Sequence, residues 1–306
     1  MQEFSFHCPT EIVFGRGVEE RTAELLRKYG AHRVFIVYGG GSVIKSGLLA
    51  RVERVITAAG LAFSVRGGVR PNPRLSFARE AVREALDFEA DFLLAVGGGS
   101  VIDTAKAIAH GTANPDTDIW DFWSGKKELK KSLPVGVILT LPAAGSETSD
   151  SSVLTNEETG EKAGLPSPFN RPAFAILNPE LAFSLSSPQL AAGIADIVMH
   201  TLERYMTHTE GNEFTDLLAE ALLQNVAKYA PIVLAHHKNY EAMSEIMWCG
   251  TISHCGLTGL GRDKDFSVHK LGHALSARYD TNHGESLTAL WGAWARAVYE
   301  DRPERF

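Results

Sequence analysis

Short apolar runs alternate with helical patterns through the first half of the chain. The runs are continuous, as in strands that are buried on both faces of a parallel sheet. Strands are expected at residues 34–38, 61–65, 92–96 and 135–140. Helices are expected between them, at residues 44–59, 76–87 and 101–110. This alternation predicts βαβ units and an α/β domain with a Rossmann-like parallel sheet.

The strand signals fade after about residue 187, and helical spacing takes over. Helices are expected at residues 188–205, 213–229, 240–258, 266–277 and 288–299. The Pro/Ser-rich stretch 178–188 marks the change between the two patterns. The chain is therefore predicted to hold an α/β domain at residues 1–185 and an all-helical domain at residues 186–306.

Composition is that of an ordinary globular protein and narrows the choice of partners. The 306 residues are 44% hydrophobic and 22% charged, which excludes disordered and collagen-like chains. A net charge of -7 argues against nucleic acid as a partner. Three scattered cysteines fit a reducing compartment. Because no secretory signal or membrane-length apolar run is read, we expect a cytoplasmic protein without a membrane partner.

A glycine-rich segment, Gly97-Gly98-Gly99-Ser100, follows one predicted strand and opens a predicted helix. Glycines let a phosphate approach the backbone, and a helix N-terminus offers free N–H groups and a positive dipole end. Ser100 is expected to cap the helix or to donate to a phosphate, and Asp103 stands at a capping-box position. The segment predicts a nucleotide phosphate site, and a capped strand–helix turn is the alternative.

A second glycine turn, Gly39-Gly40-Gly41-Ser42, follows an earlier strand. Dinucleotide sites often carry a carboxylate here to bind the ribose hydroxyls, and this turn has none. The glycines would leave room for a 2′-phosphate, and Ser42 and the nearby Lys45 would donate hydrogen bonds to it. This favours NADP over NAD. A simple glycine turn accounts for the same residues equally well.

Polar residues at helical spacing in the second half indicate a possible metal site. Asp196 and His200 stand four residues apart, as do His269 and His273, so each pair shares a helix face. His283 follows in a predicted loop. Carboxylate and imidazole ligands suit one divalent ion such as zinc or ferrous iron. Histidines among apolar residues are often structural, so the spacing alone leaves both interpretations open.

Taken in order, the motifs resemble the metal-dependent, iron-containing (group III) alcohol dehydrogenases. Within that family the chain is most similar to the NADPH-dependent butanol dehydrogenase and aldehyde reductase branch, along all 306 residues. The matching segments are PTEIVFG (9–15), PNP (71–73), GGGSVIDTAK (97–106), LPAAGSE (141–147), GIAD (193–196) with His200, HKLGH (269–273) and NHG (282–284). The resemblance implies a dehydroquinate synthase-like architecture, with a dinucleotide-binding domain followed by an all-helical metal-binding domain.

The resemblance also implies a role for each matching residue. The family's metal ligands correspond to Asp196, His200, His269 and His283. His273 matches a catalytic position near the nicotinamide that is associated with proton relay. The cofactor positions are Gly39, Gly40, Ser42, Asn72, Gly97, Gly98, Gly99, Ser100, Asp103, Thr140, Leu141, Ser146, Val153 and Lys162. Gly39 stands where NAD-preferring relatives carry an Asp, which supports NADP.

The chain departs from the family pattern at two places. Many relatives have Thr where this chain has Ala144, so one cofactor contact is expected to be missing. Relatives continue with further helices beyond the NHG motif, whereas this sequence stops at Phe306. The helical domain is therefore expected to be truncated at its C-terminus.

The implied function is hydride transfer between NADP(H) and a primary alcohol/aldehyde pair, with one divalent metal ion, Fe or Zn, polarising the substrate oxygen. Two alternatives stay open. One is a glycerol dehydrogenase-like polyol oxidoreductase that uses NAD, and the other is a nucleotide-binding fragment with impaired catalysis. The expected partners are a small alcohol or aldehyde and a second copy of the chain in a homodimer.

Overall fold

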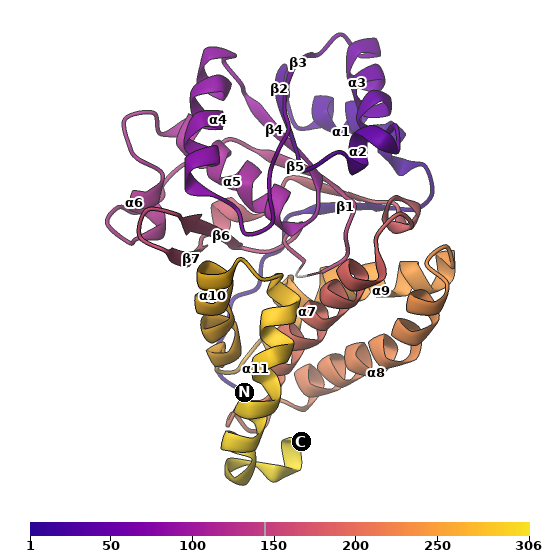
Figure 1. Cartoon of the computed structure of the whole chain (residues 1–306), viewed down its shortest axis with the longest axis vertical. Coiled ribbons are helices and arrows are strands. Elements are labelled where there is room, and N and C mark those ends of the chain that lie inside the picture. The colour runs from indigo at the N-terminus through magenta and orange to yellow at the C-terminus, as the bar shows by residue number, and fades with distance from the viewer. Residues whose placement is uncertain (144) are drawn as a thin grey trace. The chain divides into compact units, whose positions relative to one another are not determined.

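The computed structural model describes every residue except Ala144 (Figure 1). The expected loss of a cofactor contact at Ala144 therefore lies outside the described residues. The chain forms two compact units. The α/β unit holds Pro9–Leu141 and Ser146–Ser184, and the helical unit holds Met1–Cys8, Pro142–Gly145 and Leu185–Phe306. The predicted division was linear, but the N-terminal residues belong to the helical unit. Their place is explained in part by Gln2, whose backbone N–H donates to the Gly261 carbonyl at 2.9 Å.

A six-stranded sheet in the order β1-β8-β5-β4-β2-β3 lies at the centre of the α/β unit. All its strand pairs are parallel. The strands are β1 (Glu11–Phe14), β2 (Arg33–Tyr38), β3 (Ala62–Arg66), β4 (Phe92–Gly97), β5 (Val135–Leu139) and β8 (Phe174–Leu177). Every residue of β4 and β5 is buried, as their continuous apolar sequences require. The predicted parallel sheet is confirmed, although β1 and β8 were not predicted.

Helices cover the strands of this sheet. They are α1 (Thr22–Lys28), α2 (Ser42–Lys45), α3 (Leu48–Ala58), α4 (Leu75–Asp87), α5 (Gly99–Ala113) and α6 (Trp120–Trp123). The helix predicted over 44–59 is wrong as a single element, because Gly47 adopts a left-handed conformation (φ 72°) between α2 and α3. An antiparallel hairpin of β6 (Ser151–Asn156) and β7 (Glu161–Pro166) was also missed.

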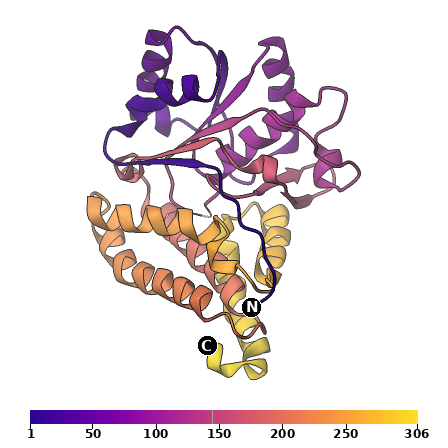
Figure 2. The same cartoon turned by 180° about the vertical axis from the view of Figure 1, so that it is seen from behind.

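Five long helices make up most of the helical unit (Figure 2). They are α7 (Ser187–Tyr205), α8 (Glu213–Ala235), α9 (Tyr240–His254), α10 (Ser267–Tyr279) and α11 (His283–Val298). Helix α7 packs against α8, α9 and α11. The expected loop around His283 is wrong: Asn282 caps α11 by accepting from the Gly284 N–H at 3.1 Å, so His283 is the first residue of that helix.

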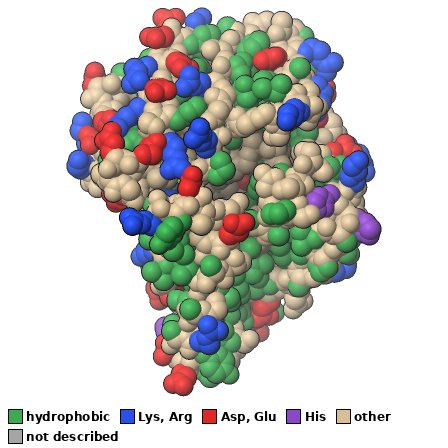
Figure 3. Space-filling view, in the orientation of Figure 1, with side chains coloured by type: hydrophobic (Ala, Val, Ile, Leu, Met, Phe, Trp, Pro, Cys, Tyr) green, Lys and Arg blue, Asp and Glu red, His purple; other side chains and the backbone are tan. Residues whose placement is uncertain are grey.

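Apolar side chains remain on the surface of the helical unit, where Figure 3 shows them gathered. Helix α8 exposes Phe214, Leu217 and Leu218. It is long and apolar enough, by length and composition alone, to cross a membrane. Because core helices of soluble proteins pass the same test, this is weak evidence, and the expected absence of a membrane partner stays a prediction.

Candidate metal and cofactor sites

One face of α7 points polar side chains into the helical unit. Four polar residues of α7 share one face of the helix, because they are spaced by four, three and one residues. They are Asp196, His200, Glu203 and Arg204. All four are buried. The start of α11 lies directly against this helix: a Cβ added at Gly284 would lie 2.0 Å from the Ala192 carbonyl oxygen. Glycine at 284 is therefore what lets α11 begin so close to α7.

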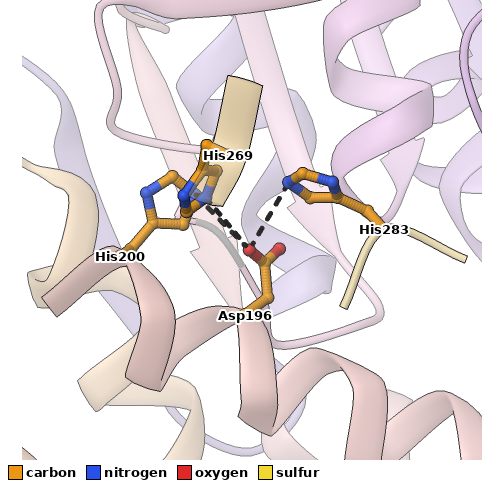
Figure 4. A group of neighbouring side chains, drawn as sticks. All are labelled: Asp196, His200, His269 and His283. Atoms are coloured by element: carbon orange, nitrogen blue, oxygen red, sulfur yellow. Dashed lines mark hydrogen bonds and ion pairs between the residues drawn. The ribbon is translucent and has the colours of Figure 1, made fainter. Parts of the chain in front are cut away.

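Three imidazoles meet the Asp196 carboxylate (Figure 4). Asp196 Oδ1 lies 3.5 Å from His200 Nε2, 3.8 Å from His269 Nε2 and 3.7 Å from His283 Nε2. The Nε2 atoms of His200 and His269 are 3.1 Å apart. Ligand atoms on one tetrahedral ion lie about 3.3 Å apart when each bond is about 2.0–2.1 Å. The distances of 3.1 to 3.8 Å given above are close to that value, and all four ligand atoms lie within 4.8 Å of one another, so small shifts would let them share one ion.

The Asp196 carboxylate supplies a second test of the fit. Its Oδ1 atom is buried and has no hydrogen-bond partner among the described residues. A buried carboxylate oxygen left without a partner is costly. A cation among the three rings would satisfy it, and the nitrogen and oxygen donors suit zinc or ferrous iron.

The histidines of the cluster differ in their electrostatic surroundings. Burial, reinforced by the nearby His254, His269 and Arg204, holds the pKa of His200 well below its ordinary value. Burial also acts to lower the pKa of His269, but the nearby carboxylates of Asp196 and Glu203, the second of which contacts the Nδ1 atom of the ring, raise it overall. His200 is therefore neutral at physiological pH, the form in which an imidazole nitrogen can bind a metal ion.

His273 lies beside the cluster but is not one of the four residues whose ligand atoms converge. It stands one turn beyond His269 on α10, is partly exposed, and its ring centroid is 5.4 Å from that of His283. His254, whose ring centroid is 4.1 Å from that of His200, was not predicted. It is the last residue of α9, and no metal-ligand type of residue stands three or four positions from it in the sequence to mark it. Glu203 was also missed, although it shares the α7 face of Asp196.

In the α/β unit, predicted cofactor residues gather at one edge of the sheet. Neighbouring strands β5, β4 and β2 end beside Thr140, Gly97 and Gly39 respectively. The Thr140 N–H donates to the Gly97 carbonyl at 3.0 Å, and the Gly68 N–H donates to the Gly39 carbonyl at 2.9 Å. The carboxyl edge of an open parallel sheet is where nucleotides bind.

The turn into α5 differs from the predicted cap. Gly98 is the N-cap and Gly99 the first helical residue, so Ser100 lies within the first turn and does not cap the helix. The capping-box role of Asp103 is also wrong, because its carboxylate accepts from the Ser146 hydroxyl at 2.6 Å and the Val153 N–H at 3.0 Å. A Cβ at Gly99 would meet nothing within 4 Å, whereas one at Gly98 would meet the Leu141 side chain at 3.0 Å.

The buried Lys106 organises this region. Its Nζ donates to the carbonyl and hydroxyl oxygens of Ser146 at 2.8 and 2.9 Å and to the Ser151 carbonyl at 2.8 Å. Asp103 Oδ1 lies 3.9 Å away. Burial lowers the pKa of Lys106 to about 8 and raises the pKa of Asp103. Three predicted cofactor residues (Asp103, Ser146 and Val153) are thus joined in one network.

Two further predicted residues contact each other. Lys162 on β7 donates from Nζ to Asn72 Oδ1 at 2.8 Å. Asn72 is buried and has a left-handed backbone (φ 56°), which is uncommon for a residue other than glycine. The contact fixes Lys162 beside the PNP loop.

Comparison with known proteins places both units in one family. The family model for iron-containing alcohol dehydrogenase matches residues 9–179, and the model for the C-terminal part of the Fe-containing alcohol dehydrogenase family matches residues 190–306. The chain belongs to the iron-containing alcohol dehydrogenase family. It is therefore an alcohol dehydrogenase, and enzymes of this family use NAD(P)H and a metal. The resemblance read from the motifs is confirmed.

Individual relatives carry names with different cofactors. The probable NADH-dependent butanol dehydrogenase 1 of Bacillus subtilis is 41% identical over 305 residues, which cover 100% of this chain and 78% of the relative. The NADPH-dependent aldehyde reductase YqhD of Escherichia coli is 37% identical, with 95% and 76% covered. A crystal structure of NADH-dependent butanol dehydrogenase A from Thermotoga maritima matches with a TM-score of 0.97 and 36% identity, over 100% of this chain and 76% of that one.

Proposed function

We propose that this chain transfers hydride between NADP(H) and a primary alcohol/aldehyde pair with the help of one divalent metal ion. The observation that carries this proposal is the convergence of three imidazoles and one carboxylate, whose ligand atoms lie within 4.8 Å of one another. The family match supports the reaction type. The names of relatives, butanol dehydrogenase and aldehyde reductase, support the substrate class.

The metal ligands are proposed to be Asp196, His200, His269 and His283. When bound, a ferrous or zinc ion supplies Lewis-acid polarisation of the substrate oxygen. One carboxylate and three neutral imidazoles neutralise only half of a divalent charge, so the ligand set leaves net positive charge at the site. An anionic substrate oxygen is favoured there, as expulsion of a hydride requires.

His273 is proposed to relay a proton between the substrate oxygen and solvent. Its partial exposure lets it exchange protons with water, and its ring centroid lies 5.4 Å from that of His283, a proposed metal ligand. Histidine suits this task because its ordinary pKa lies close to physiological pH. The expected homodimer and cytoplasmic location stay predictions.

NADP(H) is proposed as the preferred cofactor on the chemistry of the Gly39–Ser42 turn. The names of the relatives include both NADH and NADPH, so the family match does not decide between the two cofactors. No carboxylate stands at residues 39–42 to repel a 2′-phosphate, and Ser42 and Lys45 are exposed. A Cβ at Gly39 would make only ordinary contacts, the nearest at 3.4 Å. Space therefore does not explain the missing aspartate, whereas accommodation of a phosphate does.

Aldehyde-dependent oxidation of NADPH tests the proposal. The purified chain is assayed with butanal, before and after treatment with a chelator, and again after addition of Fe²⁺ or Zn²⁺. We expect chelation to abolish turnover and one of the two metals to restore it. Full activity of the metal-free protein would contradict the metal's role. Oxidation of glycerol with NAD⁺, without reduction of butanal, would favour the polyol alternative.

A further inference from the structure

Glu203 is a buried carboxylate on α7 that no motif marks. Its side chain is fully buried. Oε1 accepts from the backbone N–H groups of Val268 at 2.8 Å and His269 at 3.2 Å. Oε2 contacts Nδ1 of the His269 ring. One carboxylate thus contacts both the backbone and the ring of a proposed metal ligand.

The backbone contacts anchor the beginning of α10. Phe266, the residue at the N-cap of this helix, makes no side-chain capping hydrogen bond. Glu203 takes over that task from another helix, because it accepts from the second and third N–H groups of α10 and places a negative charge at its positive end. Its own carbonyl also accepts from the Asp265 N–H at 3.1 Å. The base of His269 is therefore fixed to α7.

The ring contact selects one tautomer of His269. A carboxylate can only accept hydrogen bonds, so the Nδ1 atom that faces Glu203 must carry a proton. The other nitrogen, Nε2, then keeps its lone pair in the neutral ring. That nitrogen lies 3.8 Å from Asp196 Oδ1 and 3.1 Å from His200 Nε2, at the point where the cluster converges.

We propose that Glu203 is the positioning residue for metal binding: it holds His269 in the tautomer and orientation that present Nε2 to the ion. Carboxylates behind ligand histidines commonly act in this way, and their loss weakens metal binding about 10- to 100-fold. The inference rests on the proposed metal site. A purely structural alternative is that Glu203 only caps α10.

Glu203→Gln separates these two roles. The amide oxygen can keep both backbone hydrogen bonds, so the helix cap is retained. The amide nitrogen then faces Nδ1 of His269 and donates to it, which moves the ring proton to Nε2. We expect the dissociation constant for Zn²⁺, measured on the metal-free chain against a competing chelator, to rise about 10- to 100-fold. The unfolding temperature of the metal-free variant should change by less than about 4 °C.

Nuclear magnetic resonance of ¹⁵N-histidine-labelled, metal-free protein reads the tautomer directly. We expect His269 to carry its proton on Nδ1 in the wild type and on Nε2 in Glu203→Gln. A capping role alone would leave both the tautomer and zinc affinity unchanged. Glu220→Gln is the matched control: this carboxylate of the same unit accepts from the Tyr205 hydroxyl at 2.8 Å, and zinc affinity should stay within about twofold.

The outcomes distinguish the inference from the proposed function. Zinc affinity of Glu203→Gln within about twofold of the wild type would overturn the positioning role and leave the metal site standing. If Glu203→Gln does not fold, Glu203→Asp keeps an acceptor-only group, and an Nε2–H tautomer of His269 in that variant would overturn the role. If the wild-type chain binds no zinc, or if Asp196→Ala binds zinc as well as the wild type does, the proposed metal site itself is wrong.

Discussion

Lys106 and Glu203 are both fully buried charged side chains, one in each unit of the molecule. Lys106 donates to oxygens of Ser146 and Ser151 and holds a turn of backbone beside the predicted cofactor residues. Glu203 accepts from the start of α10 and holds a single imidazole ring. The cation therefore organises a loop, whereas the anion orients one proposed ligand.

The two units are therefore sensitive to different kinds of change. A defect at Lys106 should spread through the hydrogen bonds of the loop and lower the stability of the α/β unit. A defect at Glu203 should act on metal binding. Each half of the chemistry, cofactor binding and metal binding, can then be damaged without the other, and the following variants test that separation.

The largest expected effect comes from Asp196→Ala, which removes the one carboxylate of the cluster. Loss of the metal removes several kcal/mol of transition-state stabilisation, so turnover of butanal should fall on the order of 10³-fold or more. NADPH binding, followed by fluorescence, should stay within about twofold, because the predicted cofactor residues belong to the other unit. Asp263→Ala, at an exposed carboxylate of the helical unit, is the control. Wild-type turnover in Asp196→Ala would end the assignment of the ligands.

Lys106→Met should have the next largest effect, on stability. The substitution removes the donor to the buried Ser146 carbonyl and one of two donors to the partly buried Ser151 carbonyl, which keeps the Ser149 hydroxyl at 3.1 Å. It also leaves Asp103 without its nearby cation. We expect the free energy of unfolding in urea to fall by about 3 kcal/mol. The exposed Lys130→Met should change it by less than about 0.5 kcal/mol. Zinc affinity should not change, and a tenfold loss would break the separation between the units.

The pH dependence of stability isolates the charge on Lys106. Burial lowers its pKa to about 8 in the folded chain, against an ordinary value of 10.5 that we assign to the unfolded chain. Between these two values the unfolded chain binds the proton and the folded chain does not, so this group's contribution favours folding increasingly as the pH rises. Relative to Lys106→Met, the wild type should gain about 1.4 kcal/mol per pH unit from about pH 8 to 10.5. A pH-independent difference would contradict the lowered pKa.

The smallest expected effect is a change in cofactor preference. Gly39→Asp places a carboxylate where the 2′-phosphate of NADP is proposed to lie, and a Cβ at this position would make only ordinary contacts. The ratio of kcat/KM for NADPH to that for NADH should fall at least tenfold, about 1.4 kcal/mol. Gly39→Asn, which adds a similar volume without charge, should change the ratio less. An unchanged ratio in Gly39→Asp would show that Gly39 does not select the cofactor.

Much of the fold could be predicted because its elements have clear periodicity. The buried strands β4 and β5 have continuous apolar sequences, and α7 has an uninterrupted helical pattern from a Pro/Ser start. The breaks were harder to predict. Gly47 could have continued a helix, and only its left-handed backbone shows that it ends one. Strands β1 and β8 have four residues each, too few to establish a period.

The candidate site was predictable where ligands recur at helical spacing, as at Asp196 and His200. Residues that act through tertiary contacts were not. Glu203 reaches His269 across 66 positions of sequence, and His254 meets His200 across 54. No local pattern encodes such pairs, because the packing of α7 against its neighbours creates them. The assigned roles of the cofactor residues stay predictions for the same reason.

X-ray absorption spectroscopy of the metal-loaded chain tests the central claim most directly, since it reports the atoms bound to the ion. We expect one zinc or ferrous ion per chain, with three imidazole nitrogens and one carboxylate oxygen at about 2.0–2.2 Å. Asp196→Ala should abolish that spectrum. Sulfur ligands, fewer than three imidazoles, or an unchanged spectrum in Asp196→Ala would contradict it.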